Sequence, residues 1–310
     1  MRQLCVLMRF ISAAVHIGTP PYNRPIKCDV NCVWGNVPSG LIRRIKLPDI
    51  NSFITLSMEG EQYYPQLKLK GVAYRQRARE YQGTTRLDSD VPMPYFYWSW
   101  TRFLDDVPLA PQKWSLNFIQ TLPPAFELAL PKALFLARNC QSKNNREQLV
   151  RELQANGVPV DAASTCLKNV NSYTHGELAD KNSMMRKYRA YLAFENQNSV
   201  DYVTEKLWGA FASGTIPIYY GAPNIAKLIP IDSAVLIQSF KSVEEAAVEI
   251  VKVLTVPAVY AKYHAWRYQP LPLHFVRRWN LTHTHSECRL CQFVHRRVHT
   301  QAVSASTVAH

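Results

Sequence analysis

The chain has 310 residues, of which 47% are apolar and 19% charged, a globular balance that excludes a largely disordered protein. Its length allows a large core and predicts two domains. The formal net charge of +13 indicates an anionic partner such as nucleic acid, a membrane surface or a sugar nucleotide. The sequence has no zinc-finger spacing and no RNA-recognition motif, and its basic residues form only short clusters. We therefore expect no nucleic-acid partner.

Seven cysteines indicate an oxidising compartment, because six of them fall into plausible pairs. The candidates are Cys28 with Cys32, Cys140 with Cys166, and Cys288 with Cys291. Spacing alone leaves their connectivity open.

A single N-glycosylation sequon at Asn280 is compatible with a secretory route. The apolar stretch at 4–18 is short, is interrupted by Arg9 and lacks a clear cleavage site, so it predicts neither a membrane span nor a signal peptide. We expect that any membrane anchor is not visible in this chain.

From about residue 130, apolar runs of strand length alternate with helical patterns. The expected strands are 133–137, 157–162, 191–196, 215–221 and 234–239. Helices are expected to begin near residues 146, 177, 202 and 242, the last with a capping box of Ser242 and Glu245. This alternation with short connections predicts a parallel, doubly wound α/β sheet.

Charged residues open two of these helices. Arg146 begins the helix after the first strand, and Tyr202, Glu205 and Lys206 begin the helix after YLAFEN. Ligands of such sheets bind outside the carboxyl ends of the strands, where helix dipoles favour a phosphate. Arg and Lys can pair with a pyrophosphate while Glu accepts from ribose hydroxyls. A plain salt-bridged helix start is the alternative.

The first 125 residues predict a smaller α/β domain, with apolar runs at 51–58 and 91–100 and a hinge near Pro123–Pro131. The aromatic residues of 95–100 are expected mostly in the core, and 74–80 is expected to form a solvated helix face.

The stretch 191–225, with its Phe-Glu-Asn strand end and its Tyr-Val-Thr-Glu-Lys, closely resembles the signature of the α1,3/α1,4-fucosyltransferases. Further segments resemble the plant-type branch that fucosylates the N-glycan core. They are SMEGEQYYP (57–65), TTRLDSDVPMPYF (84–96), NCQSKNNREQL (139–149) and HSECRLC (285–291). All lie in the family's order, within about residues 25–296.

The resemblance implies a GT-B fold, in which two Rossmann-like domains face a cleft. It places an acceptor-side domain at 20–126, a GDP-fucose-binding domain at 127–296 and a tail at 297–310. Residues 20–58 are few for the strands that such a domain needs before its Glu59, which suggests that the N-terminal domain is truncated.

Carried over residue by residue, the resemblance assigns Arg146 and Lys206 to the pyrophosphate of GDP-fucose. It assigns the nucleotide and sugar pocket to Tyr191, Asn196, Tyr202 and Glu205.

Transfer from GDP-β-L-fucose to give an α-fucoside inverts the anomeric centre, so a base must take the proton of the acceptor hydroxyl. Glu59 matches the family's acceptor-side Glu, although Gly60 stands where Ser is usual. Glu61 shares one face of an extended segment with Glu59, so spacing cannot separate them, and we favour Glu59 on the family match.

Two motifs imitate metal sites. Asp88 and Asp90 resemble the Asp-x-Asp of metal-dependent glycosyltransferases, but they lie in the acceptor-side block, and we expect a structural role and no obligatory metal. His283 and His285 with Cys288 and Cys291 have zinc-ligand spacing. The family resemblance favours a local disulfide between Cys288 and Cys291 instead.

The resemblance implies a Golgi, type II membrane α1,3-fucosyltransferase that acts on O3 of the core GlcNAc of N-glycans. Two alternatives stay open. One is the fucosylation of lactosamine (Lewis-type) antennae, and the other is a catalytically silent homologue that binds glycans or GDP-fucose.

Overall fold

A computed structural model describes residues 42–47, 52–68, 70–95, 121–171, 180–282, 289–290, 292–294 and 296. The chain divides into two compact units, Met1–Pro94 with Asn280–His310, and Tyr95–Trp279. The predicted domain boundary at residue 126 lies inside the second unit, although 96–120 fall outside the described ranges. Each unit is described by itself.

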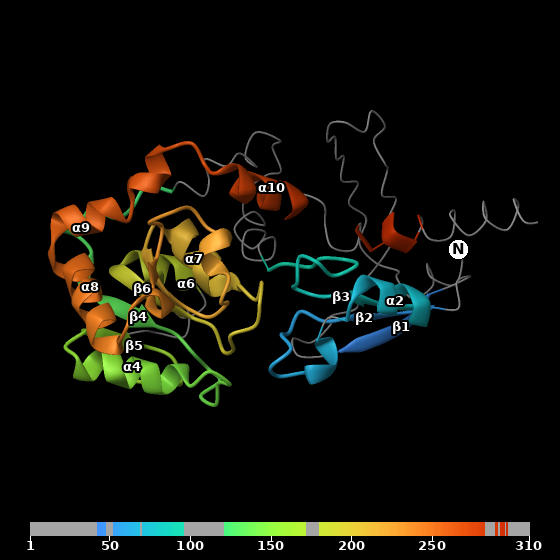
Figure 1. Cartoon of the computed structure of the whole chain (residues 1–310). Helices are drawn as coiled ribbons and strands as arrows, with labels where there is room; N and C mark the ends of the chain where they lie inside the picture. The colour runs from blue at the N-terminus through green and yellow to red at the C-terminus, as the bar shows by residue number, and fades with distance from the viewer. Residues whose placement is uncertain are drawn as a thin grey trace, which may run out of the picture. The chain divides into compact units, whose positions relative to one another are not determined.

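A five-stranded parallel sheet forms the centre of the second unit (Figure 1). Its strands are β4 (Leu130–Phe135), β5 (Val160–Ala162), β6 (Tyr188–Phe194), β7 (Ile216–Tyr220) and β8 (Val235–Leu236). Their spatial order, β5-β4-β6-β7-β8, is that of a doubly wound sheet whose connections reverse direction between β4 and β6. The α/β class predicted from the sequence is therefore confirmed.

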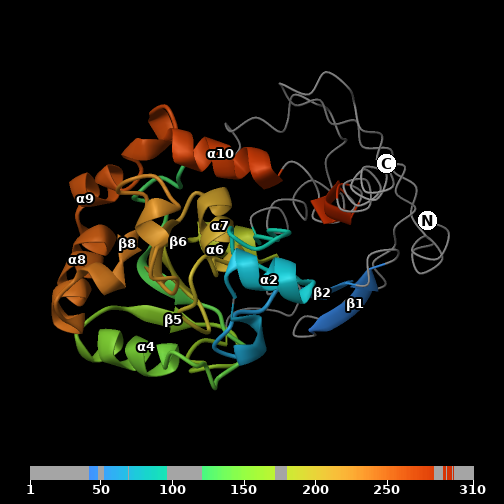
Figure 2. The ribbon, with the colours of Figure 1, turned by 45° about the vertical axis from the view of Figure 1, so that its right-hand side comes forward.

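Helices cover both faces of this sheet, as Figures 1 and 2 show. On one face lie α4 (Arg146–Ala155), α8 (Val243–Thr255) and α9 (Pro257–Lys262); on the other lie α6 (Lys181–Arg186) and α7 (Glu205–Ser213). Strand residues alternate between the two faces, so Leu192 and Phe194 join the core under α4 and α8 while Tyr191 faces the other way.

The described residues also include helix α10 (Leu273–Thr282) and four short 3₁₀ helices. The 3₁₀ helices are η1 (Pro65–Leu67), η4 (Ile225–Lys227), η5 (Ile237–Ser239) and η6 (Ala265–Tyr268). None of the helices in the described ranges combines the length and the apolar character that a membrane span needs.

The first unit holds a small mixed sheet. Strand β2 (Ser52–Leu56) pairs antiparallel with β1 (Arg43–Leu47) and parallel with β3 (Glu80–Gly83), and α2 (Val72–Ala78) connects β2 to β3. Its core contains Ile54, Leu56, Tyr81, Val91, Met93, Leu290 and Phe293. Leu290 and Phe293 lie within residues 127–296, the predicted GDP-fucose-binding domain, but they pack in the core of the first unit.

Two details of the expected elements were wrong. Residues 237–239, expected to continue a strand, form η5, so β8 has only two residues. The stretch 74–80 is helical over most of its length and mostly exposed, as expected, but Arg75 within it is buried and forms an ion pair with Asp90. In contrast, half of the expected capping box is present, because the Ser242 hydroxyl accepts from the Glu245 amide, whereas the Glu245 carboxylate accepts from the Lys241 amide.

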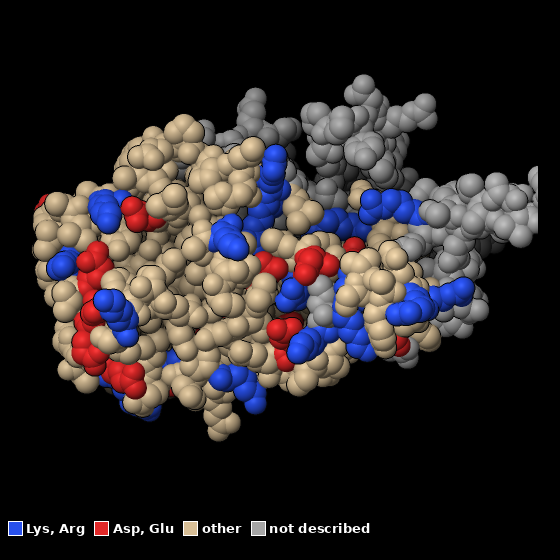
Figure 3. All heavy atoms as spheres, viewed as in Figure 1, with Lys and Arg blue, Asp and Glu red and all other residues tan. Residues whose placement is uncertain are grey.

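Basic and acidic side chains are interspersed over the described residues of the face in Figure 3. The acidic ones gather over α8, whose sequence contributes Glu244, Glu245 and Glu249. The strong positive charge of the sequence is thus not collected on the α8 side of the second unit.

Candidate functional site

The point between β4 and β6 where the sheet reverses its winding brings two loops together. Loop 136–145 follows β4, and loop 195–204 follows β6. They are joined by hydrogen bonds from the Lys143 amide to the Asn196 carbonyl at 2.9 Å, and from the Asn144 side-chain amide to the Glu195 carbonyl at 3.0 Å. In doubly wound sheets this crevice is the usual place for a ligand. We call it the switch-point rim.

Arg146 clamps the two sides of the switch-point rim. Its Nη1 donates to the Phe194 carbonyl and its Nη2 to the Asn139 carbonyl, each at 2.9 Å, while Nε contacts Glu147 at 3.1 Å. The side chain is only 3% exposed. These contacts use three of its five N–H groups on the protein itself. The arrangement supports a structural clamp that joins the loops after β4 and β6.

Lys206 is held at the start of α7 by two carboxylates. Its Nζ lies 3.2 Å from Oε2 of Glu195 and 3.3 Å from Oε1 of Glu205, and it donates to the Thr204 hydroxyl at 2.7 Å. Burial would lower the pKa of Lys206, but these two carboxylates raise it well above its usual value. The ammonium therefore stays charged, and its side chain keeps 18% exposure.

Glu195, which the sequence analysis did not single out, anchors this arrangement. It is fully buried, its Oε1 accepts from the Thr204 amide at 2.6 Å, and its Oε2 accepts from the Thr204 hydroxyl at 2.7 Å. Burial raises its pKa, and the nearby Lys206 ammonium opposes that rise. The only signal in the sequence was a carboxylate at the end of an apolar strand, where a buried charge needs a partner.

Gly221 leaves the room that Glu195 needs. A Cβ at this position would lie 2.6 Å from Cγ of Glu195 and 2.5 Å from the Tyr219 hydroxyl. That hydroxyl in turn accepts from the Ala222 amide at 2.9 Å. The glycine at position 221 is thus explained by close packing behind the switch-point rim.

Glu205, next to Lys206, is partly exposed, with 44% of its side chain accessible to solvent. Burial opposes its charge, but the Lys206 and Lys181 ammonium groups and its own backbone amide hold its pKa below the usual value. An ionised, exposed carboxylate at this place can accept hydrogen bonds from hydroxyl groups of a ligand.

Three further predicted residues line the same region. Tyr191 is buried on β6, where burial raises its pKa and the charges of Lys206, Glu205, Arg146 and Glu195 all act on it. Tyr202 is also buried and meets the ring of Tyr95 edge to face, with centroids 5.9 Å apart.

Asn196 differs from these two residues because its side chain is only partly buried. Its Oδ1 atom is buried without a hydrogen-bond partner among the described residues. This atom is an acceptor that a sugar or ribose hydroxyl could satisfy.

Glu59, the predicted base, lies in the first unit, three residues after β2 ends. It is half-buried, and its amide donates to the Ser57 hydroxyl at 3.1 Å. Glu61 follows in the adjacent turn and is also half-buried. The structure therefore confirms the expected position at a strand end but does not distinguish the two carboxylates by burial.

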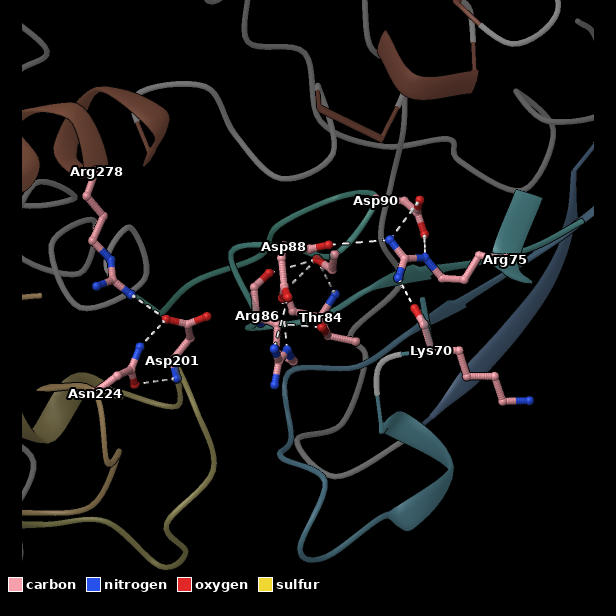
Figure 4. Close-up of polar contacts among 10 residues, drawn as sticks. Lys70, Arg75, Thr84, Arg86, Asp88, Asp90, Asp201, Asn224 and Arg278 are labelled. Carbon is pink, nitrogen blue, oxygen red and sulfur yellow. Dashed lines mark hydrogen bonds and ion pairs between the residues drawn. The ribbon is translucent and has the colours of Figure 1, made fainter. Parts of the chain in front are cut away.

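Asp88 and Asp90 each form an ion pair with an arginine (Figure 4). Asp90 pairs with Arg75 at 2.8 Å and accepts from the Gln82 amide at 2.9 Å, and Asp88 pairs with Arg86 at 2.9 Å. The Arg86 contact lowers the pKa of Asp88. These ion pairs give both carboxylates structural partners within the first unit. In the described part of the chain, no group of three or more potential metal ligands comes together.

Cys140 and Cys166 form a disulfide between the loop after β4 and the segment after β5. The other predicted pairs, Cys28 with Cys32 and Cys288 with Cys291, lie outside the described residues, as do His283 and His285. Asn280 lies in α10, but its side chain is not among the described ones.

A sequence model of the family described as "Glycosyltransferase family 10 (fucosyltransferase) C-term" matches residues 131–308, more than half of the chain. The chain belongs to glycosyltransferase family 10. Its match spans the switch-point rim and both flanking loops. This membership agrees with the predicted GT-B class, whereas the cleft between two domains stays a prediction.

Relatives carry fucosyltransferase names as well. A putative fucosyltransferase-like protein of Arabidopsis thaliana is 30% identical over 279 residues, which are 88% of this chain and 50% of that protein. GDP-fucose protein O-fucosyltransferase 3 of Rattus norvegicus is 30% identical over 190 residues, covering 58% of this chain and 37% of that protein. The chain thus spans half or less of the length of these two relatives.

Solved structures were compared as well. The crystal structure of an α1,3-fucosyltransferase with GDP has a TM-score of 0.49 and 22% identity, covering 67% of this chain and 64% of that chain.

Proposed function

We propose that this family 10 chain transfers L-fucose from GDP-β-L-fucose to a sugar hydroxyl, with inversion at the anomeric carbon. The observation that carries the proposal is Lys206, a charged ammonium held by two carboxylates at the mouth of the sheet's switch point. A diphosphate is the group that such a cation at a helix N-terminus favours.

In this proposal each residue of the switch-point rim has a separate role. Lys206 stabilises the negative charge that develops on departing GDP, an electrostatic contribution. Glu205 and Asn196 offer acceptors for hydroxyl groups of the ribose or fucose. Arg146 holds the two loops together and adds a positive charge next to the phosphates. Glu59 is proposed as the base that takes the acceptor proton.

The acceptor is proposed as O3 of the core GlcNAc of N-glycans, in α1,3 linkage. Support comes from the segments 57–65, 84–96 and 285–291, which resemble the plant-type core branch. The name of the rat relative supports a second candidate, a hydroxyl of a protein side chain. Lactosamine antennae are a third.

We infer that the protein works in the Golgi lumen. The Cys140–Cys166 disulfide supports this, because disulfides persist in oxidising compartments.

A transfer assay tests the proposal. The purified protein is incubated with GDP-fucose, without added metal and with a chelator, and with GlcNAc-terminated N-glycopeptides, lactosamine and a Ser/Thr peptide panel. Products are read by mass spectrometry and linkage analysis. A deoxyhexose at O3 of the innermost GlcNAc is expected. Transfer only to lactosamine or to a peptide would show that the acceptor is that molecule and not the core GlcNAc. GDP-fucose binding without any transfer would favour a catalytically silent homologue.

A further inference from the structure

Arg278 of α10 is a buried cation whose acidic partner lies in loop 195–204. Its side chain is 5% exposed, and Nη2 lies 3.9 Å from Oδ1 of Asp201. Nε and Nη1 are buried without a hydrogen-bond partner among the described residues. Figure 4 shows the guanidinium reaching from α10 toward Asp201. Burial lowers the pKa of Arg278 to about 10, and the Asp201 carboxylate opposes that change.

Asp201 is a strained point of its loop. Its φ of 63° lies in the left-handed region, which residues other than glycine adopt only with support. That support comes from Asn224, whose Oδ1 accepts from the Asp201 amide at 3.0 Å and whose Nδ2 donates to Asp201 Oδ1 at 2.9 Å. One carboxylate oxygen therefore joins the loop after β6, the loop after β7 and helix α10.

The residues that follow Asp201 are those of the proposed donor site. The Tyr202 carbonyl accepts from the Tyr219 hydroxyl at 3.4 Å, and the Thr204 amide and hydroxyl donate to Glu195. Lys206 comes two residues later, in the first turn of α7. Because only four residues separate Asp201 from Lys206, we expect a change at the left-handed turn to alter the position of the start of α7.

We propose that Arg278 is a positioning residue of the donor site. Through Asp201 it holds loop 195–204 in the conformation that presents Lys206 to a diphosphate, and it does not touch the ligand itself. This inference rests on the proposed function of the rim. A buried guanidinium whose Nε and Nη1 have no hydrogen-bond partner among the described residues is costly for folding, which favours a role in fixing one loop conformation.

The first test compares Arg278→Met with Arg277→Met, a matched control on the exposed side of the same helix. GDP affinity is measured by calorimetry on the whole chain, alongside a thermal unfolding midpoint. Arg278→Met is expected to bind GDP about tenfold more weakly, the range of couplings seen within one contact network. Arg278→Lys is expected to recover part of that loss, and Arg277→Met to bind as the unchanged chain does.

Amide hydrogen exchange gives a readout that needs no ligand. Exchange at Asp201, Tyr202 and Thr204 is expected to accelerate in Arg278→Met, while the amides of α8 keep their protection. If Arg278→Met does not fold, the double variant Asp201→Asn with Arg278→Met removes both charges together and is expected to show the same faster exchange.

The outcomes separate the two proposals. Unchanged loop exchange together with unchanged GDP affinity in a folded Arg278→Met chain would overturn the role of Arg278. Failure of the unchanged chain to bind GDP would overturn the proposed function, and the loop exchange would still decide whether Arg278 fixes the loop.

Discussion

Oε2 of Glu195 lies 3.2 Å from Nζ of Lys206, so the partly buried ammonium of Lys206 is paired with a fully buried carboxylate. The same carboxylate holds Thr204 by its amide and its hydroxyl. The Glu195 side chain, directly after β6, therefore contacts both the residue before α7 and the first cation of that helix.

Glu195→Gln keeps the shape of this side chain and removes its charge. Its amide nitrogen would face donors of Thr204 or Lys206, so the free energy of unfolding is expected to fall by about 3 kcal/mol, the size found for breaking buried pairs. Urea unfolding measures the loss. Glu244→Gln on α8 is the control, and equal stability of both variants would show that the Glu195 network contributes little.

Removal of the disulfide is expected to cost stability. The 26-residue separation of Cys140 and Cys166 corresponds to about 3.5 kcal/mol in the loop-entropy model. Cys140→Ser with Cys166→Ser should therefore unfold at lower urea concentration than the oxidised chain. The reduced parent chain should match this double variant; if reduction changes nothing in the parent, the bond does not constrain the second unit.

His264 predicts a loss of stability in acid. It is 2% exposed, and its Nδ1 accepts from Nε of Arg267 at 3.2 Å. Burial, with the Arg267 charge as a smaller cause, lowers its pKa to about 3. Between pH 3 and its ordinary value of about 6.5, the unfolded chain holds a proton here that the folded chain does not.

Stability should accordingly fall by about 1 kcal/mol per pH unit on acidification below pH 6.5 through this group. His264→Gln should flatten the dependence of stability on pH between pH 6.5 and 4.5, measured by thermal or urea unfolding. If the stability of His264→Gln and of the parent chain changes with pH in the same way, His264 is not a buried neutral imidazole in the folded chain.

Glu59 and Glu61 can be separated by turnover. Glu59→Gln should leave GDP affinity nearly unchanged and lower fucose transfer at least a hundredfold, because general-base catalysis contributes roughly 10²–10⁴. Glu61→Gln, in the adjacent turn, should keep transfer within a few-fold of the parent. The opposite result would move the base to Glu61.

Much of the second unit could be predicted from its sequence, because strand and helix patterns are local. The rim placement of Arg146, Glu205 and Lys206 followed from parallel topology alone. The role of Glu195 did not, since sequence spacing does not reveal that its carboxylate turns toward Thr204 and Lys206.

Contacts between distant positions were also beyond prediction. Arg75 looked like a member of a solvated basic cluster, yet it is buried against Asp90. Likewise, Asp201 is joined to Asn224 and Arg278 from two later elements. Such pairs depend on how the elements pack, which no local pattern of residues encodes.

The most direct test of the account is the affinity of Lys206→Ala for GDP, measured by calorimetry beside Lys252→Ala, an exposed lysine of α8. The account predicts that Lys206→Ala binds GDP at least tenfold more weakly while Lys252→Ala binds as the parent does. Equal affinity of a folded Lys206→Ala chain and the parent would place the diphosphate elsewhere and contradict the proposed donor site.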